Sequence, residues 1–143
     1  MIRILVVEDN PGDIHLLKMA LQIAKLECEL TVVDDGREAL DFARRQGKYA
    51  STPIPDLVVL DLNVPKNDGL EVLEALRAND AFSEVPIAVL SSSSSPRDIA
   101  KAKRIGVERF IAKPPDLEEY MKIGAELRHL VMVEQPLRTS SGG

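Results

Sequence analysis

Apolar residues along the chain fall into short runs separated by longer amphipathic stretches. Four of the runs are rich in Val, Ile and Leu and do not alternate with polar residues, which is typical of strands buried on both faces of a sheet. These runs cover residues 2–7, 57–60, 87–90 and 110–112. A fifth run, at residues 30–33, is expected to lie nearer an edge of the same sheet.

Between these runs, apolar side chains recur at steps of three and four residues, as they do on one face of an α-helix. The pattern predicts helices around residues 14–24, 39–43, 70–76, 99–105 and 117–131. Strand and helix therefore alternate five times along the chain. This alternation predicts an α/β fold in which right-handed crossovers join parallel strands and helices cover both faces of one sheet.

The length and composition fit an ordinary globular protein with one domain. The chain has 143 residues, of which 45% are hydrophobic and 29% charged. Its single cysteine, Cys28, excludes an internal disulfide and any CxxC site. The net charge is −5, and no Lys/Arg cluster stands free of acidic residues, so direct binding of nucleic acid is not expected. No stretch suits a signal peptide or a membrane span, which predicts a cytoplasmic protein.

Chemically useful residues stand directly after the apolar runs, where an open parallel sheet binds its ligands. Three carboxylates, one amide, one hydroxyl and one amine occupy these positions, namely Glu8, Asp9, Asp61, Asn63, Ser91 and Lys113. If the first and third runs are neighbours in the sheet, the three carboxylates meet in one crevice.

Three carboxylates held a few ångströms apart repel one another by several kcal/mol at an effective dielectric constant of about 20. They should therefore share a proton or hold a cation, and a hard divalent ion such as Mg²⁺ suits carboxylate ligands best. Lys113 would add a compact positive charge, and Ser91 a rotatable hydroxyl, and both suit a phosphoryl group. The residues together suit the binding of a phosphoryl group on an aspartate.

Four sequence motifs carry a family resemblance. They are LVVED at 5–9, VVLDLNVPKNDG at 58–69, VLSSS at 89–93 and FIAKPP at 110–115. In their order and spacing they resemble the receiver domain of two-component response regulators. The resemblance covers about residues 1–130, and residues 131–143 are predicted to form a C-terminal extension with a frayed tail.

The resemblance implies a flavodoxin-like (βα)5 three-layer sandwich whose five-stranded parallel sheet has the order 2-1-3-4-5. It also implies that Asp61 is the phosphoacceptor. Glu8 and Asp9 match the acidic pair that binds Mg²⁺, and Asn63 matches the residue whose backbone carbonyl joins them on the metal.

The resemblance gives roles to three further residues. Lys113 matches the lysine that pairs first with the acceptor carboxylate and then with the phosphoryl group. Ser91 matches the switch hydroxyl that moves toward the phosphoryl group, and Phe110 matches the switch aromatic ring. The Lys113–Pro114 peptide bond is cis in the family, and a cis X-Pro bond costs little energy.

The function that this resemblance implies is signalling within a phosphorelay. The partner is a sensor histidine kinase or a phosphotransfer protein. The segments GKYASTPIP at 47–55, VVLDLNVPKNDG at 58–69 and KPPDLEEYM at 113–121 are similar to those of response regulators that work with phytochromes. The chain would be a signalling protein with self-catalysed phosphotransfer and dephosphorylation, and not an enzyme acting on other substrates. Surplus apolar residues at 130–133 suggest a homodimer through the face of the fourth helix, fifth strand and fifth helix.

Two other functions fit these residues less well. An aspartyl-phosphate phosphohydrolase needs a second carboxylate two residues after its nucleophile, where this chain has Asn63, which cannot transfer a proton. A receiver-like module that binds without phosphorylation is expected to lack Asp9, Asp61 or Lys113, and this chain has all three.

Overall fold

A single parallel sheet of five strands, in the order β2-β1-β3-β4-β5, forms the centre of the structure. The computed structural model describes residues 1–66, 68–92 and 95–142. The strands are β1 (Ile2–Val7), β2 (Cys28–Val33), β3 (Leu57–Leu60), β4 (Ile87–Ser91) and β5 (Arg109–Ala112). The α/β class and the strand order 2-1-3-4-5 are therefore confirmed.

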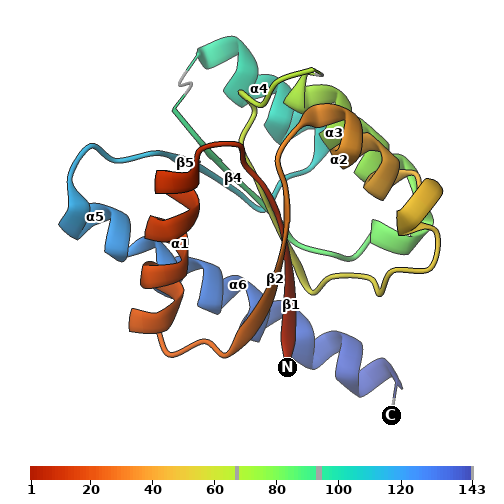
Figure 1. Cartoon of the computed structure of the whole chain (residues 1–143). Coiled ribbons are helices and arrows are strands. Elements are labelled where there is room, and N and C mark those ends of the chain that lie inside the picture. Colours follow the sequence, from red (N-terminus) through yellow and green to blue (C-terminus); the bar gives the residue numbers. More distant parts are fainter. Residues whose placement is uncertain (67, 93–94, 143) are drawn as a thin grey trace.

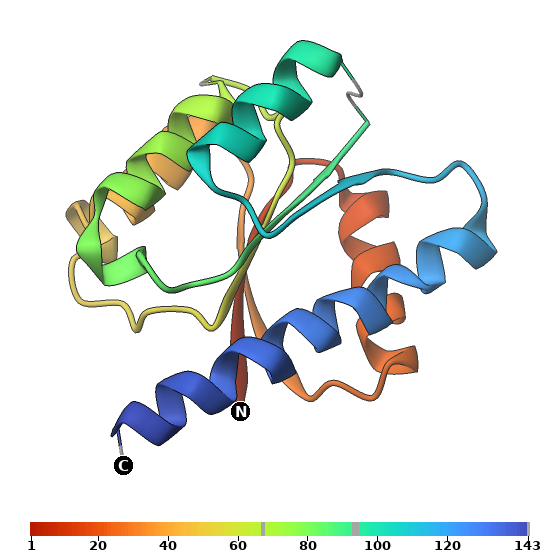
Figure 2. The ribbon, with the colours of Figure 1, turned by 180° about the vertical axis from the view of Figure 1, so that it is seen from behind.

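Helices cover both faces of the sheet, which makes three layers (Figures 1 and 2). One face carries α1 (Pro11–Ile23), α5 (Leu117–Met121) and α6 (Ile123–Gly142), which pack against one another. The other face carries α2 (Gly36–Ala43), α3 (Gly69–Ala78) and α4 (Pro96–Ile105). Short 3₁₀ helices at Gly47–Tyr49 and Asp80–Phe82 precede β3 and β4.

Each face of the sheet has its own aliphatic core, and the central strands contribute to both. Along β1, Leu5 and Val7 pack into the core beneath α2 and α3, whereas Ile4 and Val6 pack into the core beneath α1 and α6. Because successive side chains of a strand point to opposite faces, burial on both faces makes the whole run apolar. This confirms the interpretation of the continuous runs in β1, β3 and β4.

The two outer strands are less buried. β2 lies at one edge, as expected, and most of its residues are exposed or half-buried. β5 was predicted to be buried on both faces, but its residues are exposed or half-buried too. That prediction is wrong because β5 is the last strand of the sheet and pairs with β4 alone.

The last predicted helix is divided in two. α5 ends at Met121, Lys122 forms its C-cap, and α6 begins at Ile123. Gly124 then lies so close to α1 that a Cβ added to it would be 2.1 Å from the Ala20 carbonyl oxygen. The backbone of α6 continues to Gly142, through the segment predicted to be a frayed tail. The domain boundary at residue 130 stays a prediction.

The helices that follow the strands begin with capped turns. In each turn a side-chain oxygen accepts a hydrogen bond from a backbone N–H in the first turn of the helix, which stabilises the helix start. The five capping residues are Asn10, Asp35, Asp68, Ser95 and Asp116.

Candidate functional site

The ammonium group of Lys113, just beyond β5, is the centre of the site. Its Nζ lies 2.6 Å from Glu8 Oε1, 2.7 Å from Asp61 Oδ2 and 2.8 Å from Asp13 Oδ2. An ammonium has three N–H donors, so each carboxylate takes one of them. Burial alone would lower the pKa of Lys113, but the hydrogen bonds to Asp13, Asp61 and Glu8 outweigh it and raise that pKa. Lys113 is therefore fully charged at neutral pH.

Asp61 follows β3, in the middle of the sheet, and only 4% of its side chain is exposed. Its Oδ1 accepts hydrogen bonds from the Ser91 hydroxyl at 3.0 Å and from the Asn63 backbone N–H at 2.9 Å. Its Oδ2 accepts from Lys113. The carboxylate is held by three donors and cannot rotate freely.

Glu8 follows β1, next to β3, and is buried like Asp61. Its Oε2 accepts from the backbone N–H groups of Asp9 and Asn10, both at 3.1 Å, and its Oε1 accepts from Lys113. Burial raises the pKa of Glu8, although the hydrogen bonds from Lys113 and from the Asn10 N–H act in the opposite direction. The raised pKa means that ionising Glu8 costs free energy in the folded state.

Asp9 is placed differently from Glu8. Its side chain is exposed, and among the carboxylates that the structure describes it is not one of the three that contact the Lys113 ammonium. The predicted metal set of Glu8, Asp9, Asp61 and the Asn63 carbonyl stays a prediction. The three carboxylates of this set lie at the same edge of the sheet. Lys113 contacts two of them, Glu8 and Asp61.

Ser91 and Asn63 both lie beside Asp61. Ser91 is the last residue of β4 and is fully buried, and its hydroxyl donates to Asp61. The Asn63 side-chain amide lies 3.4 Å from the hydroxyl oxygens of Ser91 and of Ser92. The predicted residues Glu8, Asp61, Ser91 and Lys113 thus meet in one cluster.

The chemistry of the donor set fits a divalent cation. If all are ionised, three carboxylates face one ammonium, which leaves an excess of two negative charges that Asp9 increases further. A hard cation with oxygen ligands would neutralise this excess. The residues present therefore suit Mg²⁺.

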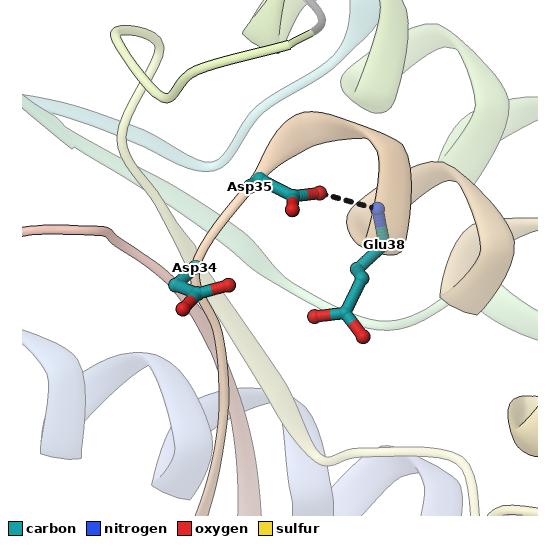
Figure 3. Close-up of side chains that lie close together, drawn as sticks. All are labelled: Asp34, Asp35 and Glu38. Atoms are coloured by element: carbon teal, nitrogen blue, oxygen red, sulfur yellow. Dashed lines mark hydrogen bonds between the residues drawn. The ribbon is translucent and has the colours of Figure 1, made fainter.

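A separate group of carboxylates lies at the start of α2 and consists of Asp34, Asp35 and Glu38 (Figure 3). Asp35 accepts a hydrogen bond from the Glu38 backbone N–H at 2.8 Å, which lowers its pKa, and pairs with Lys66 at 3.2 Å. Glu38 pairs with Lys48 at 2.9 Å. Helix capping and nearby lysines account for Asp35 and Glu38.

Sequence reasoning missed Asp13, the third carboxylate on Lys113. Asp13 lies in the first turn of α1, three residues after the capping Asn10. The signal that could have indicated it is its place just after β1, at the same edge of the sheet as the other site residues. Its partner Lys113 is 100 residues away in the sequence, so no local pattern pairs them.

A small cavity of about 10 Å³ lies beside these carboxylates, lined by Glu8, Asp13, Asp61, Tyr120 and several apolar residues. It is about large enough for one water molecule. The Tyr120 hydroxyl donates to the Asp13 backbone carbonyl at 3.4 Å. Burial, assisted by the charge of Asp13, raises the pKa of Tyr120 to about 12, so this hydroxyl keeps its proton.

Two expectations about β5 and the turn after it have different outcomes. Phe110 is half-buried and packs against the core beneath α2, α3 and α4, and its role as a switch stays a prediction. The structure has no cis peptide bond among the described residues, so Lys113–Pro114 is trans and the expected cis bond is wrong. Lys113 reaches the carboxylates with the trans bond, which is the lower-energy form for X-Pro.

A parallel sheet of this order with an aspartate, two further acids and a lysine at its carboxyl edge defines a class of signalling domain. The family model described as the response regulator receiver domain matches residues 4–124. The chain belongs to the response regulator receiver domain family. Within the described residues, we find no helical segment with the length and apolar character of a transmembrane span.

Relatives of similar length include a cyanobacterial phytochrome response regulator. The chain is 34% identical over 120 residues to Response regulator Rcp1 of Synechocystis, covering 84% of this chain and 82% of that protein. The structure of the phosphorylated cyanobacterial phytochrome response regulator RcpA matches with a TM-score of 0.83 at 35% identity, over 91% of this chain and 93% of that one. The Mn²⁺-bound form of Rcp1 matches with a TM-score of 0.81 at 32% identity, over 88% and 91%.

Proposed function

We propose that this chain is a phosphorelay response regulator that accepts a phosphoryl group on Asp61 from a phosphohistidine of a sensor histidine kinase or a phosphotransfer protein. In the transfer, an Asp61 carboxylate oxygen forms a bond to phosphorus as the bond between phosphorus and the histidine nitrogen breaks. The observation that carries this proposal is the placement of Asp61, which is buried, centred in the sheet and held by Lys113, Ser91 and Asn63.

The residues around Asp61 supply electrostatic stabilisation. Phosphoryl transfer spreads negative charge over three oxygens, so catalysis depends mainly on positioning and on nearby positive charge. Lys113 is charged and lies 2.7 Å from the acceptor, so a short movement brings its ammonium to a phosphoryl oxygen. Ser91 already donates to Asp61 and can turn its hydroxyl toward the new group.

We propose Mg²⁺ as the cofactor, held by Glu8, Asp9, Asp61 and the backbone carbonyl of Asn63. When bound, this ion would neutralise charge on the transferring oxygens. The excess of carboxylates over ammonium supports the proposal. A bound divalent ion in solved relatives supports it too, because Rcp1 has a Mn²⁺-bound form and the receiver domain of the kinase PA1611 has magnesium in its active-site cleft.

The switch that follows phosphorylation would involve Ser91 and Phe110. A phosphoryl group brings extra charge and three acceptor oxygens, which draw the Ser91 hydroxyl and make room behind it for the ring of Phe110. Phe110 has no hydroxyl, so the output cannot depend on a hydrogen bond from this ring. The altered surface would comprise α4, β5 and the predicted fifth helix, which the structure divides into α5 and α6, and protein partners rather than nucleic acid would bind it.

We also propose a homodimer through this face. Of the apolar run at 130–133, Leu130 and Val131 are buried in the core, whereas Met132 and Val133 are 43% and 49% exposed. Leu117 on α5 is 56% exposed. Sedimentation at high protein concentration tests the proposal, and a monomer both with and without phosphorylation would contradict it.

The phosphoacceptor assignment has a direct test. The protein is incubated with phosphoramidate and Mg²⁺, and its intact mass is compared with that of Asp61→Asn treated in the same way. We expect the wild type to gain one phosphoryl group and the variant to gain none. An equal gain in both proteins would overturn the assignment. Transfer from a phosphorylated phytochrome kinase, compared with an unrelated histidine kinase, tests the partner.

A further inference from the structure

Asp13 contacts the site although neither the motifs nor the metal set assigns it a role. Its Oδ2 is 2.8 Å from Lys113 Nζ, and 25% of its side chain is exposed. Its backbone is fixed on both sides, because its N–H donates to the Asn10 side chain at 3.1 Å and its carbonyl accepts from the Tyr120 hydroxyl. The carboxylate is thus presented to Lys113 from a rigid first turn of α1.

We propose that Asp13 is a positioning residue for phosphotransfer, which anchors the Lys113 ammonium while Asp61 reacts. This inference rests on the proposed function of Asp61. Of the three carboxylates on the ammonium, Asp61 is the one that reacts and loses charge on the oxygen that bonds to phosphorus. Glu8 and Asp13 do not react, so they can keep the ammonium over the acceptor as its third hydrogen bond passes from Asp61 to the phosphoryl group.

Two anchors matter because the lysine side chain is long and flexible. A four-carbon stem with a single fixed partner can swing its ammonium about that partner, whereas two fixed partners leave the third N–H aimed at the acceptor. Glu8 and Asp13 are well suited to this, because Glu8 directly follows β1 and Asp13 belongs to the helix that comes next. Both are held by hydrogen bonds to their own segment.

A purely structural role in α1 does not account for this placement. Acidic residues in a first helical turn often stabilise the helix by accepting from free N–H groups or by matching its dipole. In α1 the capping oxygen belongs to Asn10, which accepts the hydrogen bond from the Asp13 N–H. The Asp13 carboxylate contacts Lys113 instead.

The test compares Asp13→Ala with Asp13→Asn, whose amide oxygen can still accept a hydrogen bond from Lys113. Glu71→Ala is the matched control, because it removes an exposed acid from the first turn of α3. The rate of phosphorylation by phosphoramidate is measured at saturating Mg²⁺ over a range of donor concentrations. The Lys113 ammonium is followed in each protein by its ¹H–¹⁵N correlation signal, which a firm hydrogen-bonded anchor protects from exchange with water.

We expect Asp13→Ala to lower the maximal rate about tenfold with little change in the donor concentration at half-maximal rate, and to weaken the Lys113 signal. We expect Asp13→Asn to restore the rate to within about twofold and to keep the signal. Glu71→Ala should match the wild type in both measurements.

Three results would overturn the inference. One is a wild-type rate and an unchanged Lys113 signal in Asp13→Ala. Another is an equal loss in the Ala and Asn variants, which would mean that charge and not anchoring matters. The third is a lowered rate with a protected Lys113 signal. A wild-type protein that takes up no phosphoryl group would instead overturn the proposed function itself.

Discussion

Replacing Lys113 with Met tests the charge balance of the site. Methionine keeps most of the volume of the side chain but removes the ammonium that contacts Glu8, Asp13 and Asp61. The side chains of Lys113, Glu8 and Asp61 are only 10%, 8% and 4% exposed, so solvent cannot replace the lost cation well. We therefore expect a large loss of stability at neutral pH.

The size of the loss can be bounded in two ways. Removing one partner of a buried ion pair costs about 3–5 kcal/mol because a buried charge is left unpaired. A carboxylate left unpaired in this way can instead become neutral by taking up a proton. For an ordinary pKa of about 4.3, this protonation costs about 4 kcal/mol at pH 7.5. At pH 5.0 the same protonation costs about 1 kcal/mol. We expect Lys113→Met to lower the free energy of unfolding by about 3–4 kcal/mol at pH 7.5 and by about 1 kcal/mol at pH 5.0.

Urea denaturation at the two pH values, without divalent ions, measures both losses. With a slope of about 2 kcal/mol/M, the midpoint at pH 7.5 should fall by about 1.5–2 M. Lys101→Met is the matched control, since Lys101 is about half-exposed and its Nζ is 3.9 Å from Glu74. That control should change stability by less than about 0.5 kcal/mol because exposed pairs contribute little. The reasoning is refuted if Lys113→Met matches the control at pH 7.5 or loses as much at pH 5.0 as at pH 7.5.

Three further predictions concern single residues. Because burial raises the pKa of Glu8, the folded state holds the Glu8 proton more tightly than the unfolded state does. The contribution of protonated Glu8 to stability is therefore full below about pH 4.3 and is lost as the pH rises through the folded pKa. Glu8→Gln should flatten this fall in urea titrations from about pH 4.3 upward, and an unchanged slope would contradict the assignment. Gly124→Ala should lower the free energy of unfolding by about 1–3 kcal/mol or more, because the new Cβ would lie 2.1 Å from the Ala20 carbonyl oxygen. An unchanged melting temperature would show that α6 does not pack this closely on α1. Gly69→Ala should cost a similar amount, since its Cβ would be 2.5 Å from Leu62 Cα, and calorimetry showing a stabilised protein would disprove the close approach.

Much of the fold could be predicted from the sequence because its signals are local. The continuous apolar runs of β1, β3 and β4 reflect burial on both faces. Such burial is expected for the central strands of any parallel sheet that lies between two layers of helices. The exposure of β5 could not be predicted in this way, because it depends on which strand ends the sheet. The break between α5 and α6 at Lys122 was hidden because apolar periodicity continues across it.

The site was predictable where its residues directly follow strands. Glu8, Asp61 and Lys113 do so, Ser91 is the last residue of its strand, and parallel strands bring their carboxyl ends to one edge. Asp13 lies one turn into a helix, where an acidic residue is ordinary, and only the packed structure brings it to Lys113. The trans Lys113–Pro114 bond likewise has no local signature that separates it from the cis form.

A crystal structure of the protein with beryllium fluoride and Mg²⁺ tests the central claim most directly, because beryllofluoride mimics a phosphoryl group on a carboxylate. We predict beryllium bonded to an Asp61 carboxylate oxygen, with Lys113 Nζ and Ser91 Oγ at hydrogen-bond distance from its fluorine atoms. An unmodified Asp61 beside bound Mg²⁺, or a Lys113 side chain turned out to solvent, would contradict the account.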